Sequence, residues 1–246
     1  MLKLNDSKTE FFVATPSHLK HIVGPVSLCV GDMLINPSDN IRNLGIIFDS
    51  SMSFSAYITN LCCSLTYHLR NLSRIRRCLD RDTCHLVIRA LILSKIDYGN
   101  GLLLGSNKTD IQRIQRIQNW AAKMICQVRK QDHATPCLEE LHWLPVEKRI
   151  VFKVLLFVYK CLNHIAPNYI SSCITLNQPG RAGLRSASDT TRLTEHNTSK
   201  LLKSAERGAF YYNAPRMWNR LPINIRESAS LAVFKKALKT HLYKSS

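Results

Sequence analysis

One stretch, residues 138–169, constrains the fold of this chain most, because it carries the longest amphipathic helix pattern in the sequence. Pro145 suits the first turn of a helix, where its missing N–H would have no partner, and Ala166-Pro167 stops the run. The pattern therefore predicts a helix over 145–164. Apolar residues cover more than half of its circumference, and the remaining side carries three basic residues: Arg149, Lys153 and Lys160. Such a helix is nearly surrounded by protein and exposes one basic strip.

Apolar residues also recur at helical spacing in other stretches, upstream and at the end of the chain. The upstream ranges are about 53–72, 82–96 and 109–129. Ser53 and Asp82 are suitable N-terminal caps, and a last helix should begin near Ser228 or Ser230 with its lysines outward. Short connections favour packing of successive helices against one another, so we expect a helical bundle.

The part of the chain before these helices shows the composition of short strands separated by turns. The predicted strands are 10–14, 26–30, 33–35 and 41–48. The fold class is therefore α+β and mostly α, with a small N-terminal antiparallel sheet, a helical bundle and an irregular, basic C-terminal extension that begins with a loop over 174–200. We divide the chain into three domains: 1–50, 51–172 and 173–246.

The charge of the chain narrows the classes of partner. Its 34 Lys and Arg residues outnumber 17 Asp and Glu residues, which gives a formal net charge of +17, and the excess is concentrated after residue 147. A field of this sign attracts polyanions, and nucleic acid is the usual intracellular one. The alternative is a solvated basic surface without a partner.

The compartment is predicted from the apolar runs and the cysteines. No run approaches the roughly 18 apolar residues of a transmembrane helix, and the start of the chain lacks the apolar core of a signal peptide. Nine cysteines without a regular spacing fit reduced thiols. We therefore expect an intracellular protein, in the cytoplasm or nucleus, with no membrane partner and no small-molecule substrate.

Several distinctive motifs follow one another along the chain: NLGIIFD, SKIDYGN, RIQRIQNWAAKMI, LEELHWLPVEKRIVFKVLLFVYK and GAFYYNAPRMWNRLP. In this order they resemble the C-terminal region of reverse transcriptases from jockey-like non-LTR (LINE-type) retrotransposons, and the resemblance covers nearly all of the chain. It implies that residues 1–50 match the end of the polymerase palm and the primer-grip strands. It also implies that the first helices of 51–172 are thumb-like, and a thumb holds the primer–template duplex through its backbone.

Resemblance to the family does not by itself mean that the residues that catalyse DNA synthesis are present. Reverse transcription needs carboxylates that converge on two metal ions, and this sequence has no Asp-Asp pair. Asp49 and Asp97 lie in family-like motifs, but we interpret them as turn or capping residues. We expect a truncated reverse-transcriptase-like protein that is not an enzyme on its own and needs no cofactor, and a separate palm-containing chain stays open as a partner. The rival interpretation is a helical interaction or scaffold protein, or a translated element remnant without a function.

The expected residual function is sequence-independent binding of the RNA or DNA backbone by clustered basic residues. The candidates lie on three predicted helices: Arg149, Lys153 and Lys160; Arg74, Arg76 and Arg77; and Lys235, Lys236 and Lys239. The three arginines have an equally good alternative role, because basic residues at the end of a helix complement its negative terminus.

Two further groups of residues have competing interpretations. Cys126, His133, Cys137 and His142 are the right types for zinc ligands, but their spacing lacks the close pairs of structural zinc sites, so we expect no metal. The segment GAFYYNAPRMWNRLP interleaves aromatic rings with Arg216 and Arg220. It is either a stacking platform for unpaired bases or an apolar segment packed onto the bundle, and its two prolines favour packing.

Overall fold

A computed structural model of the protein describes residues 9–15, 24, 26–31, 33–177, 191–196 and 209–244. Most of the predicted loop over 174–200 lies outside these ranges. Helices dominate the described residues and the strands precede them, so the α+β, mostly α fold class is confirmed. None of the described helices combines the length and apolar composition that would let it cross a bilayer.

Two antiparallel hairpins open the fold. Their strands are β1 (Leu28–Val30), β2 (Met33–Ile35), β3 (Asn40–Asn43) and β4 (Ile46–Asp49). β1 pairs with β2 and β3 pairs with β4, in two separate sheets, so the prediction of one sheet was wrong. The predicted strand over 41–48 was also wrong, because Leu44 and Gly45 adopt φ angles of 48° and 83° and turn the chain back on itself. The predicted strand over 10–14 was wrong, because these residues form only an isolated bridge, between Phe11 and Pro37.

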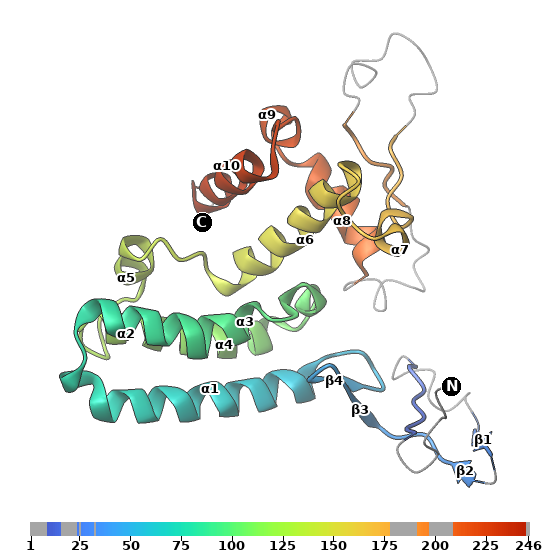
Figure 1. Ribbon diagram of the computed structural model, residues 1–246, viewed down its shortest axis with the longest axis horizontal. Coiled ribbons are helices and arrows are strands. Elements are labelled where there is room, and N and C mark those ends of the chain that lie inside the picture. The colour runs from blue at the N-terminus through green and yellow to red at the C-terminus, as the bar shows by residue number, and fades with distance from the viewer. Residues whose placement is uncertain are drawn as a thin grey trace, which may run out of the picture.

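Helices make up the rest of the fold. They are α1 (Ser55–Ile75), the 3-10 turn η3 (Arg76–Cys78), α2 (Arg81–Ile88), the π-helical turn η4 (Arg89–Leu93), α3 (Ser94–Asp97), the 3-10 turn η5 (Asn100–Leu103), α4 (Lys108–Cys126), α5 (Thr135–Glu140), α6 (Val146–Leu162), α7 (Asn168–Ser171), α8 (Phe210–Asn219), α9 (Ile223–Arg226) and α10 (Leu231–Lys244). Figure 1 shows α1 to α4 stacked together, with α6 between them and the group α8 to α10.

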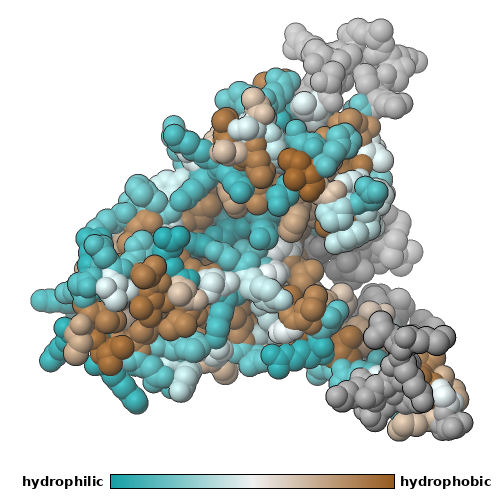
Figure 2. Space-filling view, viewed as in Figure 1, coloured by the Kyte–Doolittle hydropathy of each residue, from teal (hydrophilic) through white to brown (hydrophobic). Residues whose placement is uncertain are grey.

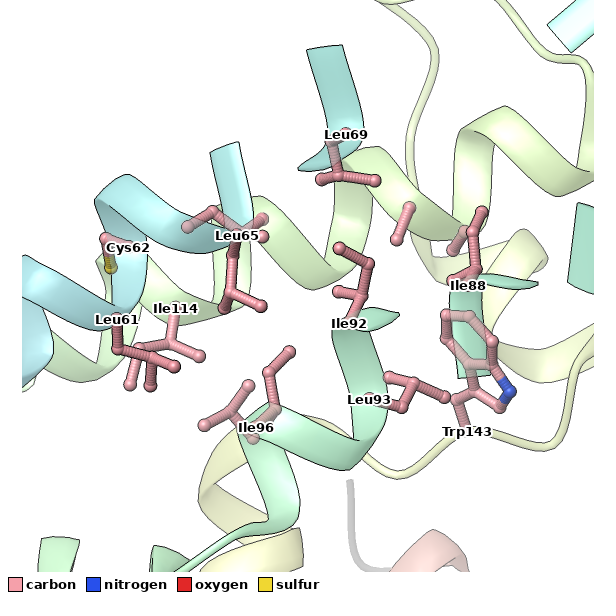
Figure 3. Packing of buried hydrophobic residues seen from close by; sticks show 14 of the residues in the cluster. Leu61, Cys62, Leu65, Leu69, Ile88, Ile92, Leu93, Ile96, Ile114 and Trp143 are labelled. Atoms are coloured by element: carbon pink, nitrogen blue, oxygen red, sulfur yellow. The ribbon is translucent and has the colours of Figure 1, made fainter. Parts of the chain in front are cut away.

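The first core lies among α1, the continuous run α2–η4–α3, and α4. Each of these elements contributes residues that are fully or almost fully buried: Ile58, Leu65 and Leu69; Ile88, Ile92 and Ile96; and Ile114, Ala121 and Ile125. Figure 3 shows the α1 leucines facing Ile92 and Ile96, with Trp143 beside Ile88 and Leu93. These are the positions that helical spacing predicts for the apolar faces.

The second core lies on the other side of α6. Val154, Val158 and Tyr159 of α6 pack there with residues of α8 and α10. Phe234 on α10 is fully buried and stacks on Tyr159, with ring centres 4.3 Å apart. Because α6 also supplies Ile150 to the first core, it is nearly surrounded by protein, as its apolar circumference predicts. The domain boundary between 172 and 173 stays a prediction.

The aromatic segment before α9 forms helix α8, with Pro215 inside it. Trp218 is fully buried, and its Nε1 donates a hydrogen bond to the carbonyl of Thr191 at 2.8 Å. The packing prediction is confirmed for this ring. Tyr211 stays 43% exposed, and the Arg216 guanidinium lies 4.0 Å from the centre of the Tyr212 ring.

The predicted cap of α2 was wrong because a neighbouring carboxylate takes its role, whereas Ser53, the predicted cap of α1, accepts a hydrogen bond from the Ser55 backbone N–H at 3.3 Å. Asp80, rather than Asp82, caps α2 by accepting a hydrogen bond from the Thr83 backbone N–H at 2.7 Å. Before α1, Asp49 accepts hydrogen bonds from the Ser51 hydroxyl, the Ser53 N–H and the Ser53 hydroxyl at 2.6, 2.9 and 3.0 Å. The interpretation of Asp49 as a turn or capping residue is confirmed for the turn that precedes α1.

Asp49 should make the free energy of unfolding of the protein depend on pH in the acidic range. Burial alone would raise the pKa of its carboxyl, but the hydrogen bonds from Ser51 and Ser53 outweigh burial and lower the pKa. A lowered folded pKa adds stability above the unfolded value of about 3.9, and this stability is lost as the pH falls through the folded pKa. Asp49→Asn should therefore cost about 1 kcal/mol at pH 7 and less at pH 3. Urea denaturation at both pH values measures this, and an equal cost at both would contradict it.

Candidate nucleic-acid interface

A cavity of about 610 Å³ lies where α6 and α10 face the run α2–η4–α3. Four cationic side chains line it, and the one carboxylate among its lining residues is Asp97. We call this cavity the basic groove, and its cationic residues are Arg89, Arg149, Lys153 and Lys239. In Figure 2, hydrophilic residues gather in this region, between α10 and α2. The groove is a product of tertiary packing, since its walls come from distant parts of the sequence.

Arg89 lies four residues after His85, so both side chains line the groove from the same face of the helix. α2 continues into the π-helical turn η4, and such a turn shifts the register of the following side chains. Ile88, Ile92 and Leu93 stay in the core while Arg89 is exposed and lines the groove. Sequence reasoning missed Arg89, because it lies in the run LVIRALIL, where every other residue is apolar. The signal available was the single charged residue inside that run.

Arg149 lines the groove but is committed to the fold. Its Nη1 donates to both carboxylate oxygens of Asp97, at 2.7 and 2.9 Å, and its Nε donates to the Leu144 carbonyl at 2.9 Å. Its side chain is only 15% exposed. The prediction that Arg149 lies on an outer strip was wrong, because its side chain is mostly buried and paired with Asp97. Its role in binding phosphate stays a prediction. Asp97, interpreted as a turn or capping residue, also forms this ion pair.

The two groove lysines, Lys153 and Lys239, have surroundings unlike those of Arg149. Lys153 lies one turn beyond Arg149 on α6, with its ammonium 5.8 Å from the centre of the Phe157 ring. Lys239 is exposed on α10. Within the described ranges, neither lysine nor Arg89 forms an ion pair. Three cations with no acidic partner thus face one concave surface.

The remaining predicted cations lie outside this groove. Lys160 on α6 and Lys235 and Lys236 on α10 do not line it, nor do Arg74 and Arg77 at the far end of α1. The structure therefore joins one lysine from each of two predicted basic strips and leaves the others apart.

Arg76 has a structural role. It donates to the carbonyls of Met124 and Ile125 at 2.8 and 3.3 Å, and to that of Leu79 at 2.7 Å. These bonds satisfy carbonyl groups at the end of α4, which have no partner within their helix. Phosphate binding by Arg76 stays a prediction. Its alternative role concerns the terminus of its own helix, whereas the structure places its guanidinium at the end of α4.

Uncharged and titratable side chains complete the groove. Burial, and after it the charge of Arg89, lowers the pKa of His85, so this imidazole is neutral at pH 7. Trp143 packs beside it, with ring centres 5.8 Å apart, and Phe152 and Leu156 supply apolar contacts. Positive charge over a partly apolar lining suits a ligand that has both phosphates and planar rings.

The four residues weighed as zinc ligands do not meet. In the part of the chain that the structure describes, no three Cys, His, Asp or Glu side chains converge as metal ligands do. Cys126 ends α4 and lies beside Cys137 of α5, and burial next to that thiol raises the pKa of Cys126 to about 12. His142 lines the basic groove instead.

No family model, no curated protein and no solved structure matches this chain. The resemblance to non-LTR reverse transcriptases therefore stays a prediction. The geometry of the groove is what bears on the function.

Proposed function

We propose that this chain binds the sugar–phosphate backbone of RNA or DNA in the basic groove, as a region of a jockey-like non-LTR retrotransposon reverse transcriptase. The observation that carries the binding proposal is the meeting of Arg89, Lys153 and Lys239, from three separate elements, without an acidic partner among the residues that the structure describes. The order of the sequence motifs supports the family. The proposal assigns no catalytic step to these residues.

Bringing like charges close together costs electrostatic free energy. Three cations that converge on one concavity repel one another, and dispersal over the surface would relieve that repulsion. A polyanion removes this cost when its phosphates lie along the groove, and it releases counterions as it binds. Charges that only keep a helical bundle soluble need not lie close together in one concavity.

The lining residues also set the kind of recognition. Lysine ammonium groups bind phosphate as point charges, and contacts to phosphate carry no sequence information. We therefore expect RNA and DNA strands of unrelated sequence to bind with similar affinity. This distinguishes the proposal from a helical interaction or scaffold protein, for which added nucleic acid is irrelevant.

The test is fluorescence anisotropy of the protein with labelled strands and duplexes of two unrelated sequences, over a series of salt concentrations. Three phosphate contacts predict that log affinity falls with log salt at a slope of roughly −2.7 for duplex and −2.1 for single strands, equally for both sequences. Binding that is independent of salt, or that differs strongly between the two sequences, would contradict the proposal.

A further inference from the structure

A second cavity, of about 520 Å³, lies between the β3–β4 hairpin, α1 and the start of α3. We call it the hairpin pocket. Among the described residues, two cations line it, Arg42 and Lys95, and no carboxylate does. Its remaining polar lining is made of hydroxyl and amide groups: Tyr57, Asn60, Ser64, Ser94 and Tyr98. Because Ser94 borders both cavities, the pocket adjoins the basic groove at the start of α3.

Lys95 is held in this pocket by neutral partners. Its Nζ donates to the Ser64 hydroxyl at 3.0 Å and lies 2.8 Å from Nε2 of His68. An ammonium has no acceptor, so Nε2 must accept the hydrogen bond and the His68 ring must be neutral. Burial, and after it the charge of Lys95, lowers the pKa of His68, in agreement with this arrangement.

Lys95 differs in this respect from other partly buried cations of the fold. Arg149 is neutralised by Asp97 and Arg113 by Asp110, at 2.7 and 3.1 Å. Lys95 is partly buried too, yet neither it nor Arg42 makes an ion pair with any residue that the structure describes. A partly buried charge is costly without an anion beside it, so the pocket is electrostatically incomplete.

An aromatic ring stands at the same pocket in a fixed position. Tyr98 is 53% exposed, and its hydroxyl donates to the Leu44 carbonyl in the turn of the hairpin at 2.6 Å. An exposed ring held by its hydroxyl offers a face on which a base can stack. A cavity of this size lies within the range of small-ligand sites, about 300–1,000 Å³, and suits one nucleotide rather than a paired helix.

We infer that the hairpin pocket binds a nucleoside monophosphate group, as a free nucleotide or as the phosphorylated end of a strand, with the phosphate on Lys95 and Arg42 and the base against Tyr98. A terminal phosphate fits better than an internal one, because a phosphate monoester carries about −1.5 to −2 charge at pH 7, which two cations balance. The inference does not depend on the basic groove.

The experiment compares one short strand in three forms, with a 5′ phosphate, a 3′ phosphate or hydroxyl groups at both ends, by fluorescence anisotropy. Wild-type protein should bind one phosphorylated form about tenfold more tightly than the hydroxyl form. Lys95→Met should abolish this preference and leave the affinity for the hydroxyl form unchanged. Arg42→Met, on an exposed strand residue, should reduce the preference without disturbing the fold, as circular dichroism checks. Lys108→Met, an exposed lysine outside both cavities, should keep it.

A competition experiment separates binding of the phosphate, by Lys95 and Arg42, from binding of the base, against Tyr98. Adenosine monophosphate should displace the phosphorylated strand at a lower concentration than inorganic phosphate does. Equal competition by the two would remove Tyr98 from the site and overturn the nucleotide assignment. Equal binding of all three strands by the wild type, or a preference that survives in both Lys95→Met and Arg42→Met, would overturn the inference altogether. None of these outcomes depends on whether the basic groove binds the backbone.

Discussion

Replacement of Trp218 by alanine should lower the free energy of unfolding by about 4 kcal/mol. The side chain is fully buried, its ring centre lies 5.8 Å from that of Phe234, and its Nε1 donates to the Thr191 carbonyl. The substitution leaves a large cavity between α8 and α10 and a carbonyl without its donor. Because α10 carries Lys239, the loss should also loosen one wall of the basic groove.

Urea denaturation followed by circular dichroism measures the effect of Trp218→Ala. Tyr211→Ala is the matched control, since this aromatic residue lies on the same helix but is 43% exposed, and it should cost less than about 1 kcal/mol. Equal costs for the two variants would mean that α8 does not pack on α6 and α10 as described.

Reversal of the charge at Arg149 should have the second largest effect and lower the free energy of unfolding by about 3 kcal/mol. Glutamate at this position would face the Asp97 carboxylate and could not donate to the Leu144 carbonyl, so an attraction becomes a repulsion in a place where the side chain is 15% exposed. Asp97 is 45% exposed, so solvent screening keeps the cost below that of a fully buried pair.

Lys153→Glu makes the same charge change one turn further along α6, where no carboxylate pairs with the lysine, and should cost less than about 1 kcal/mol. The double variant Asp97→Arg with Arg149→Glu should recover part of the stability, because the ion pair forms in reverse. If Arg149→Glu and Lys153→Glu were equally stable, the ion pair would have no structural role. Loss of nucleic-acid binding on changing Arg149 is therefore not evidence for contact with phosphate.

The helices were predictable because their burial follows a local period. The pattern over 145–164 became α6, and the last helix places Phe234 and Leu238 inward and its lysines outward. Such a pattern depends on which residue faces which side of a single helix. It needs no knowledge of the neighbouring elements.

The hairpin turn and the π-helical turn were not predictable in the same way. Leu44 adopts a φ angle of 48°, a region that an apolar residue rarely enters, and the turn residues Asn43 and Gly45 beside it are a weak local signal inside an apolar run. Arg89, at the start of η4, faces the basic groove four residues after His85, although the run around it is apolar in sequence.

The site was only partly predictable, because a helix pattern shows that a cation points outward but not what it faces. Arg149, Lys153 and Lys160 share one predicted strip, yet their surroundings differ. Asp97, from another element, pairs with Arg149, and Lys153 lines the groove while Lys160 does not. Lys239 joins Lys153 because α10 packs against α6. These differences depend on contacts between elements that are far apart in the sequence.

The central claim, that the groove binds the nucleic-acid backbone, is tested most directly by two double variants with the same change of net charge. One removes two groove lysines, Lys153→Gln with Lys239→Gln, and the other removes lysines of the same two helices outside the groove, Lys160→Gln with Lys235→Gln. The affinity for a random-sequence duplex is measured against salt, with both variants shown to be folded. The groove variant should flatten the slope of log affinity against log salt by about 1.8, and the other should leave it nearly unchanged. Equal slopes for the two variants would contradict the claim.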